Sequence, residues 1–290
     1  MTLKCKAYAK INLYLEVVGK RENGYHDLVT VMQSVSLADI LTFTRREGEG
    51  VVLDAGDALP ADDSNLVIKA AKAYFAASGA PFGVDIRLEK HIPMAAGMGG
   101  GSADAAATLR ALNTLDQNRF SDDALVEIAA EIGADVPFCL LGGTRLCRGI
   151  GEVMTPVSNK LNCALVVAVA GEGVSTPTAF GALDKLYDDF KDFDKNALLV
   201  KLLDGMEKGS ISDTVSALFN RFEVAVEPMR PAVSALKKAM LENRALAAQM
   251  SGSGPSVFGI FADLAEAERA AKALSAMGAR AYACELIKAL

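Results

Sequence analysis

The sequence predicts an α+β protein of two domains, and three observations support this. A chain of 290 residues exceeds the usual size of one small domain. Segments with the two-residue period of strands alternate with Ala-rich amphipathic segments in both halves, which favours two layers in each domain. The pattern pauses near residues 151–160, where Pro156 and Asn159 lie. We therefore place the domain boundary between residues 1–155 and 156–290.

The first strand is expected over residues 7–18, where apolar and polar side chains alternate. One face carries Ile11, Leu13, Leu15 and Val17, and the other carries Tyr8, Lys10, Asn12, Tyr14 and Glu16. This period is typical of a half-buried strand. Asn23-Gly24 follows it and indicates a turn.

The later elements follow from periodicity and from capping residues. Ser64 or Asn65 is expected to begin one helix and Gly79 to end it. The first domain should hold strands at 28–44, 84–90 and 138–141 and helices at 65–78, after residue 102 and from 121 to 133. The second domain should hold strands at 164–169, 256–261 and 280–287 and helices at 194–206, 212–246 and 264–276.

Charge and cysteine content exclude several classes of function. The formal net charge of −6 disfavours binding to nucleic acid, although a local site can still attract a small anion. The five cysteines form no CxxC pair, which indicates reduced thiols rather than disulfides or a zinc site. No signal peptide and no apolar run of transmembrane length is visible, so we expect a cytoplasmic protein without a membrane partner.

One glycine-rich segment has no parallel elsewhere in the chain. It contains four glycines within five residues, Gly97, Gly99, Gly100 and Gly101, and an Ala/Leu helix begins directly behind them. Glycine lets the backbone approach a ligand, and the start of the helix offers unpaired N–H groups and a positive dipole end. This arrangement suits a phosphate group, and the Ser102 hydroxyl could donate to a phosphate or lie near a magnesium ion. The alternative is a flexible loop that merely allows close packing of the helix.

Two common phosphate-binding motifs do not describe this segment. A Walker loop requires a lysine that is absent here. A dinucleotide-binding loop requires an acidic residue after a second strand, and none stands in the expected place.

The segment instead resembles the ATP loop of the GHMP kinases, whose usual form is Pro-x-x-x-Gly-Leu-Gly-Ser-Ser-Ala. Its run of glycines resembles the diphosphocytidyl-methylerythritol kinase branch of that family. Ala103 stands where many relatives have a second serine, which removes one hydroxyl without changing the glycine loop. The resemblance assigns ATP binding to Pro93, Met94, Ala95, Ala96, Gly97, Met98, Gly99, Gly100, Gly101, Ser102 and Ala103.

Two further segments resemble motifs that carry the chemistry of these kinases. Residues 7–13, Ala-Tyr-Ala-Lys-Ile-Asn-Leu, resemble the first motif, although Lys10 and Asn12 could also be part of an exposed sheet face. Residues 133–137, Gly-Ala-Asp-Val-Pro, match another. A carboxylate placed on an acceptor hydroxyl can take its proton, and a neighbouring lysine stabilises charge on the transferred phosphoryl group. We expect Asp135 to be the general base and Lys10 its electrostatic partner.

Three segments are candidates for substrate binding. Asn23-Gly24-Tyr25-His26 resembles an element of the diphosphocytidyl-methylerythritol kinases in which tyrosine and histidine meet a cytosine ring; alone, it is a turn with a packed histidine. Phe180 could close the base from the other side. Residues 250–258 resemble the third motif of the family, whose small residues let backbone approach substrate phosphates, or form an ordinary turn. The expected substrate-binding residues are Asn12, Tyr25, His26, Phe180, Gly252, Ser253 and Gly254.

The resemblance implies a specific reaction. It implies a two-domain GHMP kinase fold with a ferredoxin-like C-terminal domain and an active site in the cleft between the domains. It also implies transfer of the ATP γ-phosphate, with Mg²⁺, to the 2-hydroxyl of a substrate that carries a cytidine diphosphate group, in the non-mevalonate isoprenoid route. The sequence identifies no magnesium ligands. The alternatives are a GHMP kinase for homoserine, mevalonate or a sugar, and a nucleotide-binding protein without catalysis.

Overall fold

The structure is a computed structural model that describes residues 1–56, 59–187, 190 and 196–289. The chain forms two compact units. The first comprises Met1–Ala9, Leu37–Pro93 and Gly99–Leu141, and the second comprises Lys10–Ser36, Met94–Met98 and Gly142–Leu290. The long strands β1 (Thr2–Lys20) and β2 (His26–Arg46) each contribute residues to both units. This division by compactness differs from our sequence-based boundary at residues 155 and 156, which remains a prediction about the family's domains.

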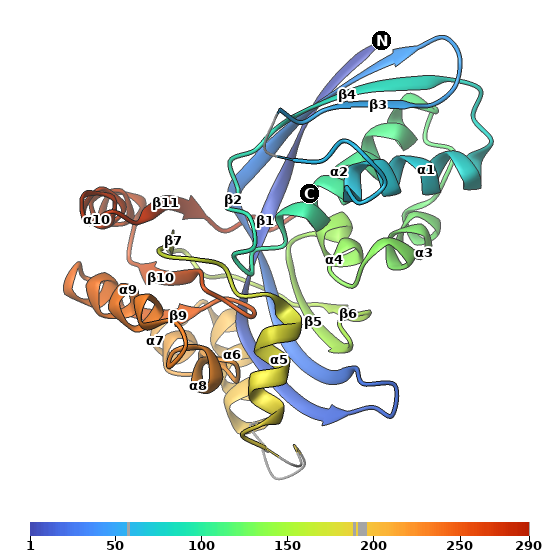
Figure 1. Cartoon of the computed structure of the whole chain (residues 1–290). Coiled ribbons are helices and arrows are strands. Elements are labelled where there is room, and N and C mark those ends of the chain that lie inside the picture. The colour runs from blue at the N-terminus through green and yellow to red at the C-terminus, as the bar shows by residue number, and fades with distance from the viewer. Residues whose placement is uncertain (57–58, 188–189, 191–195, 290) are drawn as a thin grey trace. The chain divides into compact units, whose positions relative to one another are not determined.

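The first unit combines strands with a group of helices (Figure 1). Strand β4 (Gly83–Glu89) pairs antiparallel with β2, with Ile40 opposite Glu89, and β3 (Val51–Asp54) pairs parallel with β4. The helices are α1 (Leu66–Ser78), α2 (Gly100–Leu115), α3 (Asp122–Ile132) and α4 (Val136–Leu141). Helix α2 packs against the other three helices, and most of its residues are buried.

The helix ends of this unit confirm the predicted caps. The Asn65 side chain accepts a hydrogen bond from the Val67 N–H, and Gly79 ends α1 in the left-handed conformation. The Ser121 side chain accepts from the Ala124 N–H at the start of α3. Helix α2 differs, because its N-cap Gly99 provides no side-chain hydrogen bond. The first N–H groups of α2 therefore have no side-chain cap.

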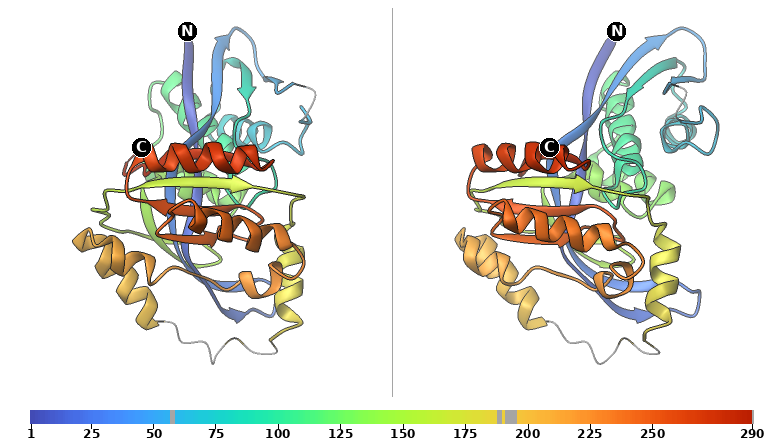
Figure 2. Two further views of the ribbon diagram at one scale, coloured as in Figure 1. Left: turned by 90° about the vertical axis from the view of Figure 1, so that its left-hand side faces the viewer. Right: turned by 60° about the vertical axis from the view of Figure 1, so that its left-hand side comes forward.

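The second unit contains a four-stranded antiparallel sheet with the order β11-β7-β10-β9. These strands are Arg280–Glu285 (β11), Ala164–Val169 (β7), Val257–Phe261 (β10) and Ala247–Met250 (β9). Helices α9 (Pro231–Glu242) and α10 (Leu264–Ala276) lie side by side across this sheet (Figure 2). Every residue of β7 is buried, so the core of this unit lies between sheet and helices.

The remaining elements of the second unit are shorter. Strand β5 (Thr144–Gly149) pairs antiparallel with β2 and with β6 (Val153–Pro156), and β8 (Phe219–Asn220) pairs parallel with β1 at Tyr14 and Leu15. The other helices are α5 (Thr176–Asp184), α6 (Asn196–Lys208), α7 (Ile211–Val215) and α8 (Glu223–Val226). Within the described ranges, the structure has no helix that is long and apolar enough to span a membrane.

Three expectations about local structure were wrong. Residues 138–141 lie in helix α4 rather than in a strand, because so short an apolar run fits either element. The helix expected over 212–246 is divided into α7, β8, α8 and α9, since residues 219–220 pair with β1 and Pro231 begins a new helix. The first strand is not half-buried, because residues 9–17 are buried on both faces. The part of the expected 194–206 helix before Asn196 lies outside the described residues.

Candidate active site

The polar face of β1 carries a buried chain of hydrogen bonds. The Lys10 Nζ donates to Asn12 Oδ1 at 2.9 Å, and Asn12 Nδ2 donates to Thr30 Oγ1 at 2.8 Å. The Thr30 hydroxyl in turn donates to the Tyr14 carbonyl at 2.6 Å. Lys10 and Asn12 are 5% and 1% exposed. A buried ammonium needs such partners, so these hydrogen bonds fix the position of the Lys10 ammonium.

In the second unit, residues 94–98 of the glycine-rich segment and the predicted third motif at residues 250–258 are joined near Asn12. The Asn12 N–H donates to Ser251 Oγ at 3.2 Å, and Ser251 Oγ donates to the Gly97 carbonyl at 3.4 Å. The Lys10 N–H donates to the Met98 carbonyl at 3.0 Å. Asn220 holds the motif from the other side, donating to the carbonyls of Met250 at 2.8 Å and Gly252 at 2.9 Å. The structure thus brings together three segments that the sequence singled out separately.

Two glycines allow this close approach. A Cβ on Gly97 would lie 2.5 Å from the Ser251 carbonyl oxygen, and a Cβ on Gly252 would lie 2.9 Å from the Gly97 carbonyl oxygen. Both residues also have positive φ, +75° and +57°. These positions therefore require glycine for reasons of space and of backbone conformation. Ser253 lies in the same turn, with its hydroxyl 3.2 Å from the Thr176 hydroxyl.

The rest of the glycine loop begins helix α2 in the first unit. Gly99 has a φ of +66° and precedes the first turn, which contains Gly100, Gly101 and Ser102. Gly101 is exposed, whereas Ser102 is half-buried. Because no side chain caps this 16-residue helix, its N–H groups and dipole can receive an anion.

Asp135 lies in the turn that separates α3 from α4. It is half-buried, and its carbonyl accepts the Cys139 N–H at 3.0 Å as α4 begins. The pairing expected between Lys10 and Asp135 stays a prediction.

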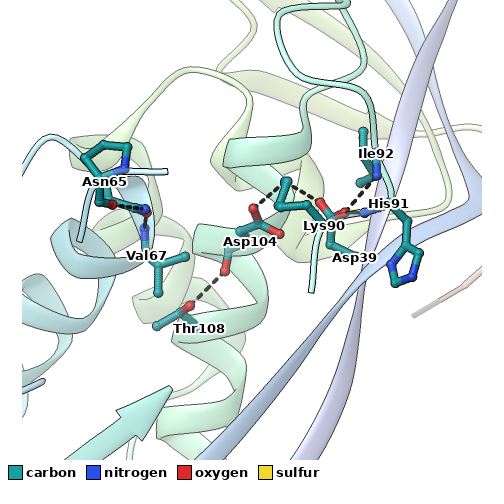
Figure 3. Close-up of polar contacts among 9 residues, drawn as sticks. Asp39, Asn65, Val67, Lys90, His91, Ile92, Asp104 and Thr108 are labelled. Atoms are coloured by element: carbon teal, nitrogen blue, oxygen red, sulfur yellow. Dashed lines mark hydrogen bonds and ion pairs between the residues drawn. The ribbon is translucent and has the colours of Figure 1, made fainter. Parts of the chain in front are cut away.

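A buried charge cluster of the first unit was missed by the sequence reasoning (Figure 3). Lys90 Nζ donates to Asp39 Oδ2 and, at 2.7 Å, to Asp104 Oδ2. Asp39 and Asp104 are 0% and 3% exposed. Lys90 stands just before the glycine loop and Asp104 just after it, which was a signal in the sequence; Asp39 lies far from both and gave none.

The predicted substrate residues His26 and Phe180 contact each other. Their rings stack with centroids 4.4 Å apart and an interplanar angle of 16°, and Phe190 packs edge-on against His26. At that separation no third ring fits between them, so a base that Phe180 holds would have to displace His26 or use another face. Tyr25, in contrast, is 60% exposed.

Asp184 orients His26, and the sequence reasoning did not identify it. His26 Nε2 lies 2.7 Å from Asp184 Oδ1, and Lys20 Nζ donates to Asp184 Oδ2 at 2.6 Å. Burial acts to raise the pKa of Asp184, but the hydrogen bonds from Lys20 and His26 outweigh it and hold that pKa below its usual value. An ionised carboxylate only accepts hydrogen bonds, so His26 Nε2 carries a hydrogen. Phe180 and Asp184 stand four residues apart on α5, which explains how one helix reaches His26 twice.

Among the described residues, no group of three or more His, Cys, Asp or Glu side chains could hold a metal ion.

Comparisons with known proteins define the class to which this site belongs. Residues 65–143 match the family described as GHMP kinases N terminal domain, and residues 200–280 match GHMP kinases C terminal. The first match contains the whole glycine loop and Asp135, and the second contains Asn220. The chain is a GHMP kinase, a small-molecule kinase that uses ATP.

Full-length relatives narrow the class further. A 4-diphosphocytidyl-2-C-methyl-D-erythritol kinase of Caldicellulosiruptor bescii is 39% identical over 273 residues, which are 94% of each chain. A kinase of the same name from Pelotomaculum thermopropionicum is 42% identical over 93% of each chain. A solved structure of 4-(cytidine 5'-diphospho)-2C-methyl-D-erythritol kinase is 35% identical, has a TM-score of 0.83, and covers 98% of this chain and 99% of that one. The chain belongs to this kinase family, and its two-domain α+β fold is the GHMP kinase fold predicted from the sequence.

Proposed function

We propose that this protein transfers the γ-phosphoryl group of ATP to the 2-hydroxyl of 4-diphosphocytidyl-2-C-methyl-D-erythritol. The reaction is a step of the non-mevalonate route to isoprenoid precursors and would take place in the cytoplasm. The observation that carries the proposal is full-length similarity to kinases of this name. The assembled contacts among Lys10, Asn12, Gly97 and Ser251 support it, because they join the segments that the family's motifs occupy.

The proposed roles follow from the chemistry of phosphoryl transfer, which requires mainly positioning and stabilisation of charge. The loop from Pro93 to Ala103 binds the phosphates through backbone N–H groups. Lys10, whose ammonium is fixed by Asn12, stabilises negative charge on the transferred group. Asp135 takes the proton of the acceptor hydroxyl. The two family domains are proposed to divide at residues 155 and 156.

Substrate binding is assigned to Asn12, Tyr25, His26, Phe180 and residues 252–254. Of these, Tyr25, His26 and Phe180 are proposed to meet the cytosine ring. With Nε2–H donated to Asp184, a neutral His26 has its Nδ1 as an acceptor. The 4-amino group of cytosine is a donor and could meet such an acceptor. Exposed Tyr25 offers a ring face on which the base could stack.

The proposal is tested by turnover of purified protein with ATP and Mg²⁺. The cytidyl substrate is offered beside homoserine, mevalonate and galactose, and formation of ADP is followed. We expect turnover with the cytidyl substrate alone. Turnover with another acceptor would keep the kinase class but refute the cytidyl pocket. A folded protein that binds ATP and converts none of the four would instead be a nucleotide-binding protein without catalysis.

The catalytic roles have their own test. Asp135→Asn removes the general base without changing the shape of the side chain, and kcat should fall by about 10² to 10⁴-fold. Asp122→Asn, at the exposed start of α3 in the same unit, is the matched control and should keep full activity. Near-normal kcat in a well-folded Asp135→Asn protein would exclude the assigned base.

A further inference from the structure

A single buried carboxylate holds the segment that leads into the glycine loop. Asp39 of β2 is fully buried, and its Oδ1 accepts the N–H groups of His91 at 2.5 Å and Ile92 at 2.8 Å. Its Oδ2 accepts from Lys90 Nζ. Three consecutive residues immediately before Pro93 therefore donate to one side chain (Figure 3). The path of the chain into the loop depends on this carboxylate.

Lys90 extends the connection to the helix behind the loop. Its Nζ donates to Asp104 Oδ2 at 2.7 Å, and Asp104 lies at the start of α2. The helix start also packs closely against this segment: a Cβ on Gly100 would lie 3.1 Å from Ile92 Cγ2 and 3.4 Å from Lys90 Nζ. The residues on either side of the glycine loop are thus joined by the cluster Asp39–Lys90–Asp104.

Burial of charged groups makes this cluster unfavourable if its only role is to pack two segments together. Two carboxyl groups and one ammonium are withdrawn from water, and apolar side chains of similar volume would hold the same segments with a smaller desolvation penalty. Asp104 Oδ1 is buried and has no hydrogen-bond partner among the described residues. This unfavourable burial argues against a purely structural role and favours a role of the cluster in phosphate binding at the start of α2.

The protonation state of Asp104 is consistent with a role in phosphate binding. Burial is the main cause that raises the pKa of Asp104 to about 7; Lys90 opposes the rise and Asp39 adds to it. Asp39 accepts hydrogen bonds from three donors. With Asp104 neutral, the cluster contains one cation and one anion, so it adds no net negative charge beside the helix start.

We propose that Asp39 is a positioning residue for ATP: through Lys90 and Asp104 it holds the segment entering the glycine loop against helix α2. The proposal rests on the use of ATP in the proposed function but not on the identity of the acceptor. Asp39 is not assigned to the reacting atoms, so it should determine the affinity for ATP and leave the rate of transfer at saturating ATP nearly unchanged.

The test compares two variants of similar shape. In Asp39→Asn the amide oxygen can still accept the backbone N–H groups, whereas its NH₂ group faces the Lys90 ammonium, so donor meets donor. Asp85→Asn is the matched control, because Asp85 is an exposed partner of Arg46 in the same unit. Affinity for ATP is measured by calorimetric titration without acceptor, and KM for ATP and kcat are measured with the cytidyl substrate.

For Asp39→Asn we expect Kd and KM for ATP to rise about tenfold, with kcat within about twofold of wild type and the control unchanged. Affinity equal to that of wild type would overturn the proposal. A fall in kcat that matches loss of folded protein, with unchanged Kd in the folded fraction, would also overturn it, since the role would be structural alone. Wild-type protein that binds no ATP would refute the proposed function instead.

A second variant covers the case in which Asp39→Asn does not fold. Asp104→Leu keeps all three donors of Asp39 and removes only the acceptor through which Lys90 contacts α2. We expect a smaller loss of ATP affinity, about threefold, because one of the two links remains. Unchanged affinity in Asp104→Leu would show that the cluster does not position the loop.

Discussion

Replacement of Gly97 by alanine tests whether close backbone approach builds the candidate site. The new Cβ would lie 2.5 Å from the Ser251 carbonyl oxygen and near the Gly254 backbone, at 3.1 Å from its nitrogen. These neighbours are main-chain atoms, so they cannot rotate away as the tip of a side chain could. Gly97 also has a φ of +75°, where an alanine is strained.

The size of the effect can be separated into two parts. A left-handed backbone costs alanine about 1–2 kcal/mol, and forcing an extra carbon into a packed site costs about 1–3 kcal/mol more. Gly278→Ala is the matched control, because Gly278 has a φ of +90° and a Cβ there would meet nothing within 4 Å. Gly278→Ala should lose only the stability that the left-handed backbone costs an alanine. The difference between the two variants therefore measures the close approach itself.

The assay combines urea unfolding with the KM for ATP. Gly97→Ala should lower the free energy of unfolding by about 1–3 kcal/mol more than Gly278→Ala does, or raise the KM for ATP by about fivefold or more if the strain falls on the loop. Gly278→Ala should leave that KM unchanged. Equal losses of stability in the two variants, together with equal KM values, would refute the reasoning.

Three other perturbations probe the polar contacts of the two units. Asn12→Leu removes an acceptor of the buried Lys10 ammonium and the donor to Thr30. In denaturant unfolding we expect the free energy of unfolding to fall by about 1–3 kcal/mol, and kcat should also fall. An unchanged free energy of unfolding would contradict the importance of these hydrogen bonds. Asp104 has a pKa raised from 3.8 to about 7, so the stability it contributes is present below about pH 4 and is lost as the pH rises toward 7. Asp104→Asn should therefore gain stability relative to wild type between pH 5 and pH 8 in urea unfolding, and a constant difference would show that the carboxyl does not titrate there. Asp184→Asn should raise the KM for the cytidyl substrate several-fold and leave the KM for ATP unchanged. The control Asp204→Asn alters an exposed ion pair with Lys208 and should change neither KM. An unchanged KM for the cytidyl substrate in Asp184→Asn would exclude Asp184 as the residue that orients His26.

Local chemistry explains which parts of the fold were predictable. Caps such as Asn65 and Ser121 act on N–H groups two or three residues away, so the sequence contains the whole interaction. The six apolar or small residues of α4 offer no such evidence, because a short apolar run fits a strand or a helix equally. The pairing of residues 219–220 with β1 depends on contacts about 200 residues apart in the chain, and it divided a segment whose own periodicity favoured one helix.

The candidate site shows the same division. Lys10, Asn12, Gly97 and Ser253 were identified because each lies in a compact motif with its own chemistry. Asn220, Thr30 and Asp39 act on these motifs or on their flanks from distant parts of the chain, and no spacing pointed to them. Asp184 is an intermediate case: its distance of four residues from Phe180 on one helix could have suggested it once Phe180 was chosen. The stacking of Phe180 on His26 could not be foreseen, because both residues were expected to contact the base rather than each other.

The most direct test of the central claim follows the phosphorus atoms themselves. Wild-type protein is mixed with ATP, Mg²⁺ and the cytidyl substrate, and the reaction is recorded by phosphorus NMR. The account predicts that the γ-phosphate signal of ATP disappears as a new phosphomonoester signal forms on the substrate, while the diphosphate signals of the cytidyl group persist. Release of inorganic phosphate alone, or no change in a protein that binds ATP, would contradict it.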